Sequence, residues 1–346
     1  MVRVWVVGFG TVGRWLVDAV DSHADRLAAR YDAAVSVVGV GNARDGFVYR
    51  PDGLDLPALL ASTAEGGSLA DQPRVDHWAS AIDGLRATEA DVLVEVTAST
   101  AADGEPGLTH ISEALERGMP VVTSNKWPVA LHGVRLAELA RANGVAFRAE
   151  STVMSGTPLL SALTRGLAGV VPIALRGILN ATANDILTSM AAGQSYDEAL
   201  AAAQQAGLAE RDPSADVDGP DTVAKVMILA ALVFGRQLRI EDVVCRGISG
   251  VTSSEVAAAL ADGGRVRHVA SLAFSEADGR GAVDARVEPV RLGRDDALAA
   301  IDGTTNAVIL RADPVGEVTI AGPGAGPELA GQGVFSDLIA VARGAP

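Results

Sequence analysis

The stretch Val2-Arg3-Val4-Trp5-Val6-Val7-Gly8-Phe9-Gly10-Thr11-Val12-Gly13 decides the fold of the N-terminal half of this chain. Its β-branched first part predicts a short buried strand, and its glycines follow the pattern Gly-x-Gly-x-x-Gly. An amphipathic segment over 14–30 then predicts a helix, and an apolar run over 35–40 predicts a second strand. Strand, glycine turn, helix and strand in this order are typical of a dinucleotide-binding unit.

The glycines of this turn have different expected roles. Gly8 permits the tight turn, Gly10 lets the backbone approach a pyrophosphate, and Gly13 lets the helix pack closely on the strand. The N-terminus of the helix that follows faces the anion, and Thr11 and Val12 of the same turn join the three glycines as expected cofactor-binding residues. The alternative is a glycine-rich turn that binds nothing.

The end of the second strand discriminates between the two nicotinamide dinucleotides. An acidic residue there holds the ribose 2′-hydroxyl of NAD, whereas an arginine pairs with the 2′-phosphate of NADP. The chain reads Gly41-Asn42-Ala43-Arg44-Asp45 at this place. Neutral Asn42 and cationic Arg44 slightly favour NADP. Two alternatives stay open: Arg44 as an ordinary solvated loop charge, and Asp45 as a ligand for NAD.

Strands and helices go on alternating to about residue 150. A strand over 91–97 ends at Thr97, and a strand over 120–123 leads into Ser124-Asn125-Lys126. Parallel sheets bind ligands at the carboxyl ends of their strands, so Thr97 and Lys126 are expected beside the cofactor. The alternation predicts an α/β fold with a doubly wound parallel sheet of the Rossmann type. The mixed pattern after residue 151 predicts a second, α+β domain.

Composition limits the class of protein. A length of 346 residues suggests two domains, and a net charge of −15 argues against binding to nucleic acid. The longest apolar run, over 226–234, is too short to span a membrane, and the first residues show no signal-sequence pattern. A lone cysteine, Cys245, excludes an internal disulfide. We therefore expect a soluble, cytoplasmic protein without nucleic-acid or membrane partners.

Lysine is scarce in this chain. Of 28 cationic residues only two are lysines, Lys126 and Lys225. A lysine can lose its proton in a site that lowers its pKa, whereas an arginine stays charged. The two lysines therefore suggest tasks that arginine cannot perform, with chance retention as the alternative. The acidic excess with little lysine also suggests a saline cytoplasm.

The densest group of acidic residues lies over 210–221, just before Lys225. Asp221 follows Pro220 at the start of an apolar helix, which places it one turn before Lys225 on the same face. Apolar neighbours disfavour the charged form of a lysine, so the pattern predicts a general acid/base role for Lys225. A solvated acidic loop and an ordinary surface ion pair are the alternatives.

Taken together, the motifs and their order resemble the homoserine dehydrogenase family in its short form. The segments that carry the resemblance are 8–13, 123–126, 150–158, 177–188, 205–225, 306–308 and 322–326. The block from Gln205 through Glu210 to Lys225 is the most specific, and the likeness spans essentially the whole chain. It implies NAD- or NADP-dependent interconversion of L-aspartate 4-semialdehyde and L-homoserine, in threonine and methionine biosynthesis.

The resemblance also implies roles for single residues. Lys225 acts as the acid/base with Lys126 beside the reacting centre, while Glu210 and Asp221 are expected to hold the substrate at its ammonium group. A monovalent cation such as sodium is expected at a further set of oxygens. Its expected ligands are Glu150, Val153, Ser155 and Thr157.

Domain organisation follows from the same likeness. It implies an NAD(P)-binding domain over 1–150, a substrate-binding, catalytic and dimerisation domain over 151–310, and a segment over 311–346 that packs back on the first domain. Gly326 or Gly324 is expected to return to the nucleotide. The protein is expected to be a homodimer. The chain stops soon after Asp337, so no regulatory ACT domain is expected.

The chain departs from the family pattern at three places. Ala181 stands where the family often has glycine, Asp185 stands where an aromatic residue is common, and Met154-Ser155 replaces a pair of glycines. The first two affect the loop on the substrate side, and the third affects the cation site.

Three other functions compete with this one. A semialdehyde-oxidising enzyme with a thioester intermediate would need Cys245, which the sequence predicts to be a buried core thiol. Another Rossmann-type dehydrogenase, such as a sugar oxidoreductase, leaves the 210–225 block unexplained. A non-catalytic NAD(P)-sensing protein would need no pair of lysines.

Overall fold

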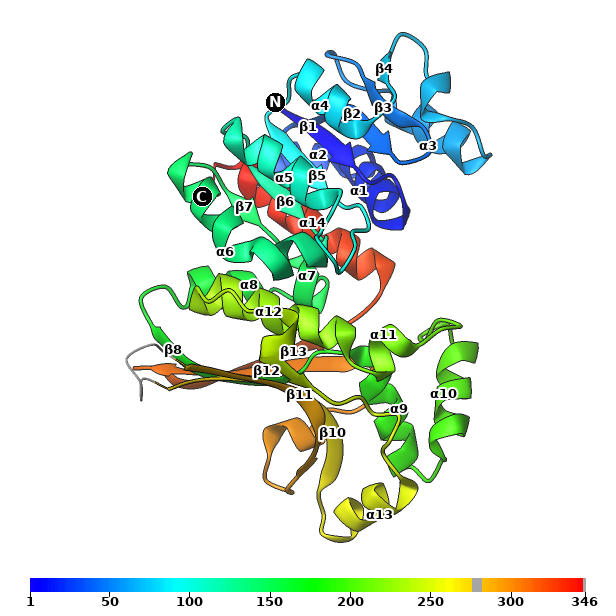
Figure 1. Cartoon of the computed structure of the whole chain (residues 1–346). Coiled ribbons are helices and arrows are strands. Elements are labelled where there is room, and N and C mark those ends of the chain that lie inside the picture. The colour runs from blue at the N-terminus through cyan, green and yellow to red at the C-terminus, as the bar shows by residue number, and fades with distance from the viewer. Residues whose placement is uncertain (276–281, 345–346) are drawn as a thin grey trace. The chain divides into compact units, whose positions relative to one another are not determined.

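The computed structural model describes residues 1–275 and 282–344, which form two compact units (Figure 1). The first unit contains Met1–Gly156 together with the C-terminal segment from Gly326. The second unit contains Thr157–Ala325. Within the described ranges, no helix is both long and apolar enough to cross a membrane.

The first unit is built on a seven-stranded sheet with the order β4-β3-β2-β1-β5-β6-β7. Its strands are β1 (Val2–Val7), β2 (Val35–Asn42), β3 (Gly46–Tyr49), β4 (Asp76–Trp78), β5 (Val92–Glu95), β6 (Val121–Thr123) and β7 (Phe147–Arg148). Pairing is parallel from β2 through β1, β5 and β6 to β7, whereas β3 and β4 add an antiparallel edge. The predicted doubly wound parallel sheet is confirmed, and the sequence had not indicated the β3–β4 edge.

Helices flank this sheet. They are α1 (Thr11–Ser22), α2 (Ala24–Tyr31), α3 (Leu56–Ala64), α4 (Ala81–Ala87), α5 (Gly107–Glu116), α6 (Lys126–Ala142), α7 (Ser151–Met154) and α14 (Pro327–Ala342), with a 3₁₀ turn over Leu69–Asp71. The single helix expected over 14–30 is divided in two, because His23 leaves the helical conformation with φ −111° and ψ 13°.

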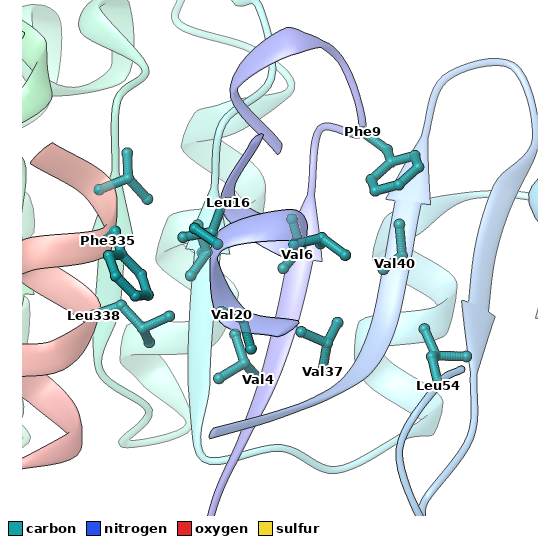
Figure 2. Packing of buried hydrophobic residues seen from close by; sticks show 14 of the residues in the cluster. Val4, Val6, Phe9, Leu16, Val20, Val37, Val40, Leu54, Phe335 and Leu338 are labelled. Atoms are coloured by element: carbon teal, nitrogen blue, oxygen red, sulfur yellow. The ribbon is translucent and has the colours of Figure 1, made fainter. Parts of the chain in front are cut away.

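The C-terminal helix α14 belongs to the core of the first unit. Figure 2 shows Phe335 and Leu338 of α14 packed near Leu16 of α1. Phe335 is 1% exposed and Leu338 is 0% exposed, and Trp15 meets Phe335 edge-on with 6.3 Å between ring centroids. Full burial stabilises a fold by about 1.5–3 kcal/mol for each such side chain. Residues some three hundred positions apart thus share one core.

The second unit has a six-stranded sheet with the order β13-β12-β8-β10-β11-β9. The strands are β8 (Val171–Ile178), β9 (Val243–Cys245), β10 (Arg265–Ser275), β11 (Ala282–Leu292), β12 (Thr305–Asp313) and β13 (Gly316–Pro323). All neighbours pair antiparallel except β9 and β11, which are parallel. This mixed sheet confirms the α+β class that was predicted for the second domain.

Most helices of the second unit lie in sequence between β8 and β10. They are α8 (Leu159–Ser161), which continues as a π-helical turn over Ala162–Gly166, α9 (Ala181–Ala191), α10 (Tyr196–Gln205), α11 (Ser214–Val217), α12 (Pro220–Phe234) and α13 (Ser253–Ala261). Short 3₁₀ turns cover Ile240–Asp242 and Ala297–Ala300.

The boundaries of the compact units differ from the domain limits expected at 150 and 310. The chain enters the second unit at Thr157 and returns to the first at Gly326. The later return has a clear cause: residues 311–313 complete β12, and β13 pairs antiparallel with β12, so both remain in the sheet of the second unit. Only the part from Gly326 onward packs with the first unit.

Candidate active site

The glycine turn after β1 has the geometry of a dinucleotide cradle. Gly8 has φ +108°, and a Cβ atom on it would lie 2.5 Å from the carbonyl carbon of Val96. A Cβ on Gly13 would lie 2.0 Å from the Gly8 oxygen, whereas a Cβ on Gly10 would have no atom within 4 Å. Gly8 and Gly13 therefore serve close packing of the backbone, and Gly10 borders open space where a phosphate could approach.

Helix α1 begins directly at this turn. Its N-cap is Gly10, which offers no side-chain cap, so Thr11 and Val12 lie in a first turn whose amides no side chain caps. Uncapped amides at a helix N-terminus carry a partial positive charge and form a favourable environment for an anion. The residues present thus fit a pyrophosphate group.

The loop after β2 is held by Asp45. The Asn42 Nδ2 donates to Asp45 Oδ2 at 2.9 Å, and the Arg44 Nε lies 3.1 Å from Asp45 Oδ1. Burial alone would raise the pKa of Asp45, but hydrogen bonds from Arg44, Asn42 and Ser68 outweigh it and hold that pKa at about 2. The Asp45 side chain is only 7% exposed, so its carboxylate serves the loop itself.

Arg44 is the exposed charged residue of this loop. Its side chain is 63% exposed, and its guanidinium also donates to the Gly67 oxygen at 2.8 Å. These bonds fix the guanidinium in one orientation while leaving part of it accessible to an incoming anion.

Two further predicted cofactor residues lie at the carboxyl ends of β5 and β6. Thr97 follows β5 closely, and Asn125 and Lys126 follow β6 as the N-cap and first residue of α6. Asn125 Nδ2 donates to Thr97 Oγ1 at 3.2 Å, so the structure brings the two strand ends together. The buried Glu95 joins them, with one carboxylate oxygen 3.0 Å from Asn125 Nδ2. Glu95 was not predicted from the sequence, although a carboxylate at the end of an apolar strand is a visible signal.

In the second unit, Lys225 lies on the buried helix α12. Gly219 with φ +100° precedes Pro220 at the helix start, and Gly235 with φ +64° ends the helix. The Lys225 side chain is 9% exposed; its Nζ lies 2.8 Å from Asp221 Oδ2 and donates to the Leu179 oxygen at 2.6 Å. The pair predicted from sequence therefore forms, and it is a buried pair rather than an ordinary surface one.

Asn180 and Asp216 complete this polar cluster. Asn180 caps α9 by accepting from the Ala183 amide at 2.8 Å, which turns its Nδ2 toward Asp216 Oδ1 at 2.7 Å and Asp221 Oδ2 at 3.1 Å. Burial, and then the charge of Asp221, raise the pKa of Asp216. Neither residue was predicted from the sequence as part of the site. Asp216 lay within the acidic block, but its partner Asn180 comes from another segment.

Three other residues singled out from the sequence are Glu210, Asp185 and Gly326. Glu210 is exposed, and its backbone oxygen accepts from Gln204 Nε2 at 3.1 Å. Among the described contacts, none joins Glu210 to Lys225 or Asp221. Asp185 on α9 has a pKa raised by burial. Gly326 is the N-cap of α14, with φ +136°.

The loop expected to bind a cation begins at Glu150. Glu150 is 5% exposed, its amide donates to Asp337 Oδ2 at 2.9 Å, and Val153 lies in α7. Ser155 ends this helix with φ +50°, a conformation that glycine adopts more readily than serine, which accounts for the glycine expected at this position. Thr157 begins the second unit. Within the described ranges, no group of three or more His, Cys, Asp or Glu residues could hold a metal ion.

Cys245 is exposed in β9, so its prediction as a buried core thiol is wrong. Its Sγ donates to the Asp218 oxygen at 3.3 Å. Partial burial of the sulfur, and then the charge of Asp218, raise the pKa of the thiol. A raised pKa disfavours the thiolate that a covalent mechanism requires.

Comparisons with known proteins agree over the whole chain. Two family models match: the homoserine dehydrogenase NAD-binding domain over 8–150, and homoserine dehydrogenase over 158–339. An NAD(+)-dependent homoserine dehydrogenase of Pseudomonas canavaninivorans is 39% identical over 345 residues, which cover 99% of this chain and 97% of the relative.

Solved structures show the same likeness. A homoserine dehydrogenase from Thiobacillus denitrificans has a TM-score of 0.81 at 31% identity, covering 99% of this chain and 73% of the other. A hyperthermophilic archaeal homoserine dehydrogenase in complex with NADPH also has a TM-score of 0.81, at 29% identity, covering 98% of this chain and 97% of the other.

Proposed function

Because this chain belongs to the homoserine dehydrogenase family, we propose that it interconverts L-aspartate 4-semialdehyde and L-homoserine with NAD or NADP. The observation that carries the proposal is the buried cluster around Lys225, whose ammonium group lies 2.8 Å from the Asp221 carboxylate on an otherwise apolar helix. An alcohol dehydrogenase of this kind needs a proton donor and acceptor, and it needs no nucleophile.

Lys225 moves the proton in the proposed reaction. In the reductive direction negative charge develops on the aldehyde oxygen, and the Lys225 ammonium stabilises this charge and then supplies the proton. In the oxidative direction the Lys225 amine accepts the hydroxyl proton. The nicotinamide group supplies or accepts the hydride when the cofactor is bound. Lys126, the other lysine, contributes a second cation to the reacting centre.

Carboxylates bind the substrate ammonium group in this proposal. Asp221 and Glu210 were expected to do so, and the structure adds Asp216 as a third candidate because it shares Asn180 with Asp221. Asn180 holds both carboxylates on one side of its amide, and two carboxylates near one lysine leave a net negative charge for a cationic substrate group.

The cofactor is held by the glycine turn and the loop after β2. Gly8, Gly10, Thr11, Val12 and Gly13 would bind the pyrophosphate. Thr97, Lys126 and Gly326 would meet the rest of the dinucleotide. Arg44 favours NADP because its guanidinium is exposed and already oriented, whereas Asp45 is committed to the loop. The Pseudomonas relative carries the name NAD(+)-dependent, and the archaeal structure contains NADPH, so both cofactors occur among relatives.

Three further features belong to the proposal. A monovalent cation such as sodium would use oxygens of Glu150, Val153, Ser155 and Thr157. The second unit would bind substrate and form a homodimer, while the first unit would bind the dinucleotide. The protein would act on a small molecule in the cytoplasm.

The experiment that tests this function is an initial-rate assay of L-homoserine-dependent reduction of NAD and NADP, run side by side and with added sodium. We expect a rate that saturates in homoserine, with NADP preferred. Arg44→Gln should lower the preference for NADP over NAD without removing activity with NAD. No homoserine-dependent rate with either cofactor would refute the proposal, and an unchanged preference in the variant would refute the role of Arg44.

A further inference from the structure

Glu95 is a buried carboxylate that the proposed reaction does not use directly. It is the last residue of β5, has 0% exposure, and lies in register between Val7 of β1 and Thr123 of β6. An ionised carboxylate removed from water is costly unless hydrogen bonds and charge compensate it. Its partners therefore indicate what this residue holds in place.

The hydrogen bonds described for the Glu95 carboxylate come from Thr97, Asn125 and Thr123, whose hydroxyl lies 3.4 Å from Oε2. The Thr97 backbone amide donates to Oε1 at 3.2 Å, and the Thr97 hydroxyl donates to the same oxygen. Asn125 Nδ2 donates to Oε2 at 3.0 Å. His110 Nδ1 lies 3.7 Å from Oε1, too far for a hydrogen bond. An ionised carboxylate accepts hydrogen bonds only, so this set of donors suits it.

The hydrogen bond between Glu95 and Asn125 fixes the orientation of the Asn125 side-chain amide at the carboxyl ends of β5 and β6. Asn125 is the N-cap of α6, yet its side chain does not cap the helix. Its Nδ2 is directed instead to Glu95, to Thr97 Oγ1 at 3.2 Å and to Ser99 Oγ at 2.7 Å. The Oδ1 on the other side of the amide accepts no hydrogen bond within the part of the chain that the structure describes.

The bonds to Thr97 fix the neighbouring loop. A Cβ on Gly8 would lie 2.6 Å from the Thr97 amide nitrogen, so this peptide packs directly on the glycine turn. One carboxylate thus ties the end of β5 to the turn after β1 and to the start of α6, where Lys126 is the first residue.

We propose that Glu95 is a positioning residue for the nicotinamide end of the cofactor, an inference that rests on the dinucleotide-dependent function proposed above. It turns the Asn125 amide so that its oxygen, rather than its NH₂ group, is available beside Lys126. That oxygen accepts a hydrogen bond from the NH₂ of the nicotinamide carboxamide.

Glu95→Gln tests this role with little change in size. A glutamine has one acceptor oxygen and one NH₂ donor, so its donor must face either the Thr97 backbone amide or the Asn125 NH₂ group, and both of these can only donate. The conflict is relieved if the Asn125 amide rotates and presents NH₂ to the carboxamide. We expect Glu95→Gln to bind NADPH at least tenfold more weakly than the wild type in titration calorimetry. Binding of 2′-phospho-ADP-ribose, which lacks the nicotinamide, should change less than twofold.

If the protein uses NAD, the same comparison is made between NADH and ADP-ribose, the fragment of NADH that lacks the nicotinamide. Glu116→Gln is the matched control, since it makes the same chemical change at an exposed position on α5 and should leave both ligands unaffected. If Glu95→Gln does not fold, Asn125→Ala replaces it, because it removes the acceptor oxygen and should cause the same selective loss.

The outcomes separate this inference from the proposed function. Equal weakening of NADPH and the fragment would show a merely structural role and overturn the inference, as would unchanged binding of both. Wild-type protein that binds neither dinucleotide would refute the proposed function itself. Selective loss of NADPH binding supports the inference even if homoserine is not turned over.

Discussion

The buried imidazole of His268 gives the second unit a pH-dependent stability that can be worked out from its surroundings. His268 on β10 is 2% exposed, and its Nε2 lies 3.1 Å from the Arg246 oxygen while its Nδ1 has no partner in the described structure. Burial lowers its pKa from 6.5 to about 4. Its Cε1 lies 3.6 Å from where a Cβ on Gly219 would stand, at the turn that begins α12.

The sign follows from proton binding. Between pH 4 and 6.5 the unfolded chain binds a proton at this imidazole and the folded chain does not, so stability falls as pH decreases through this window. One pKa unit corresponds to about 1.4 kcal/mol, so the full decrease from this group is about 3 kcal/mol. Above pH 6.5 neither the folded nor the unfolded chain binds this proton, so His268 no longer makes the free energy of unfolding depend on pH.

The assay is denaturant unfolding of the wild type and of His268→Gln at several pH values from 4 to 7.5. Glutamine cannot titrate, and its NH₂ can still donate to the Arg246 oxygen. We expect the wild type to lose about 3 kcal/mol more than the variant as the pH falls from 7 to 4. His77→Gln, which removes an exposed imidazole, is the control. Equal pH dependence in wild type and His268→Gln would refute the reasoning.

Three other substitutions test the site. Lys225→Arg should fold but lose turnover on the order of 100-fold or more, because arginine does not release a proton readily. The control is Arg236→Lys, the reverse exchange at an exposed position, which should leave kcat unchanged. A near-normal kcat of Lys225→Arg would contradict the acid/base role. Gly8→Ala should weaken NADPH binding and lower Tm, since φ +108° and a 2.5 Å approach to Val96 leave no room for a methyl group; unchanged Tm and affinity would argue against the cradle. Asp216→Asn should raise Tm at pH 7, because burial raises the pKa of Asp216 and its ionised form costs stability there. That gain should shrink as the pH falls through about 4 and vanish below about pH 3, where the aspartate is protonated in both states. A gain that is undiminished at about pH 3 would disprove the cause.

Local patterns carried much of the fold. The glycine spacing over 8–13 and the strand–helix alternation predicted the parallel sheet, since both depend on residues close in sequence. The contact between Asp221 and Lys225 was also predictable, because one helical turn separates them. The return of Phe335 into the first core was expected only through the family resemblance, because no local pattern reports a contact over such a distance.

The parts of the site that the sequence did not indicate depend on contacts between segments. Asn180 meets Asp216 and Asp221 only because α9 begins beside α11 and α12. Glu95 becomes a centre of hydrogen bonds only when β5 and β6 lie side by side. Cys245 was misjudged because its apolar neighbours suggested a core strand, whereas β9 is an edge strand with an exposed sulfur.

Hydride transfer from L-homoserine to the nicotinamide can be followed directly with deuterium. Wild-type protein is incubated with L-homoserine that carries deuterium on its hydroxymethyl carbon and with NADP or NAD, and the reduced nicotinamide is analysed by mass spectrometry. We expect one deuterium to appear on the nicotinamide ring, and we expect Lys225→Arg to suppress this transfer on the order of 100-fold. Reduced cofactor without deuterium, or no transfer while the dinucleotide still binds, would contradict it.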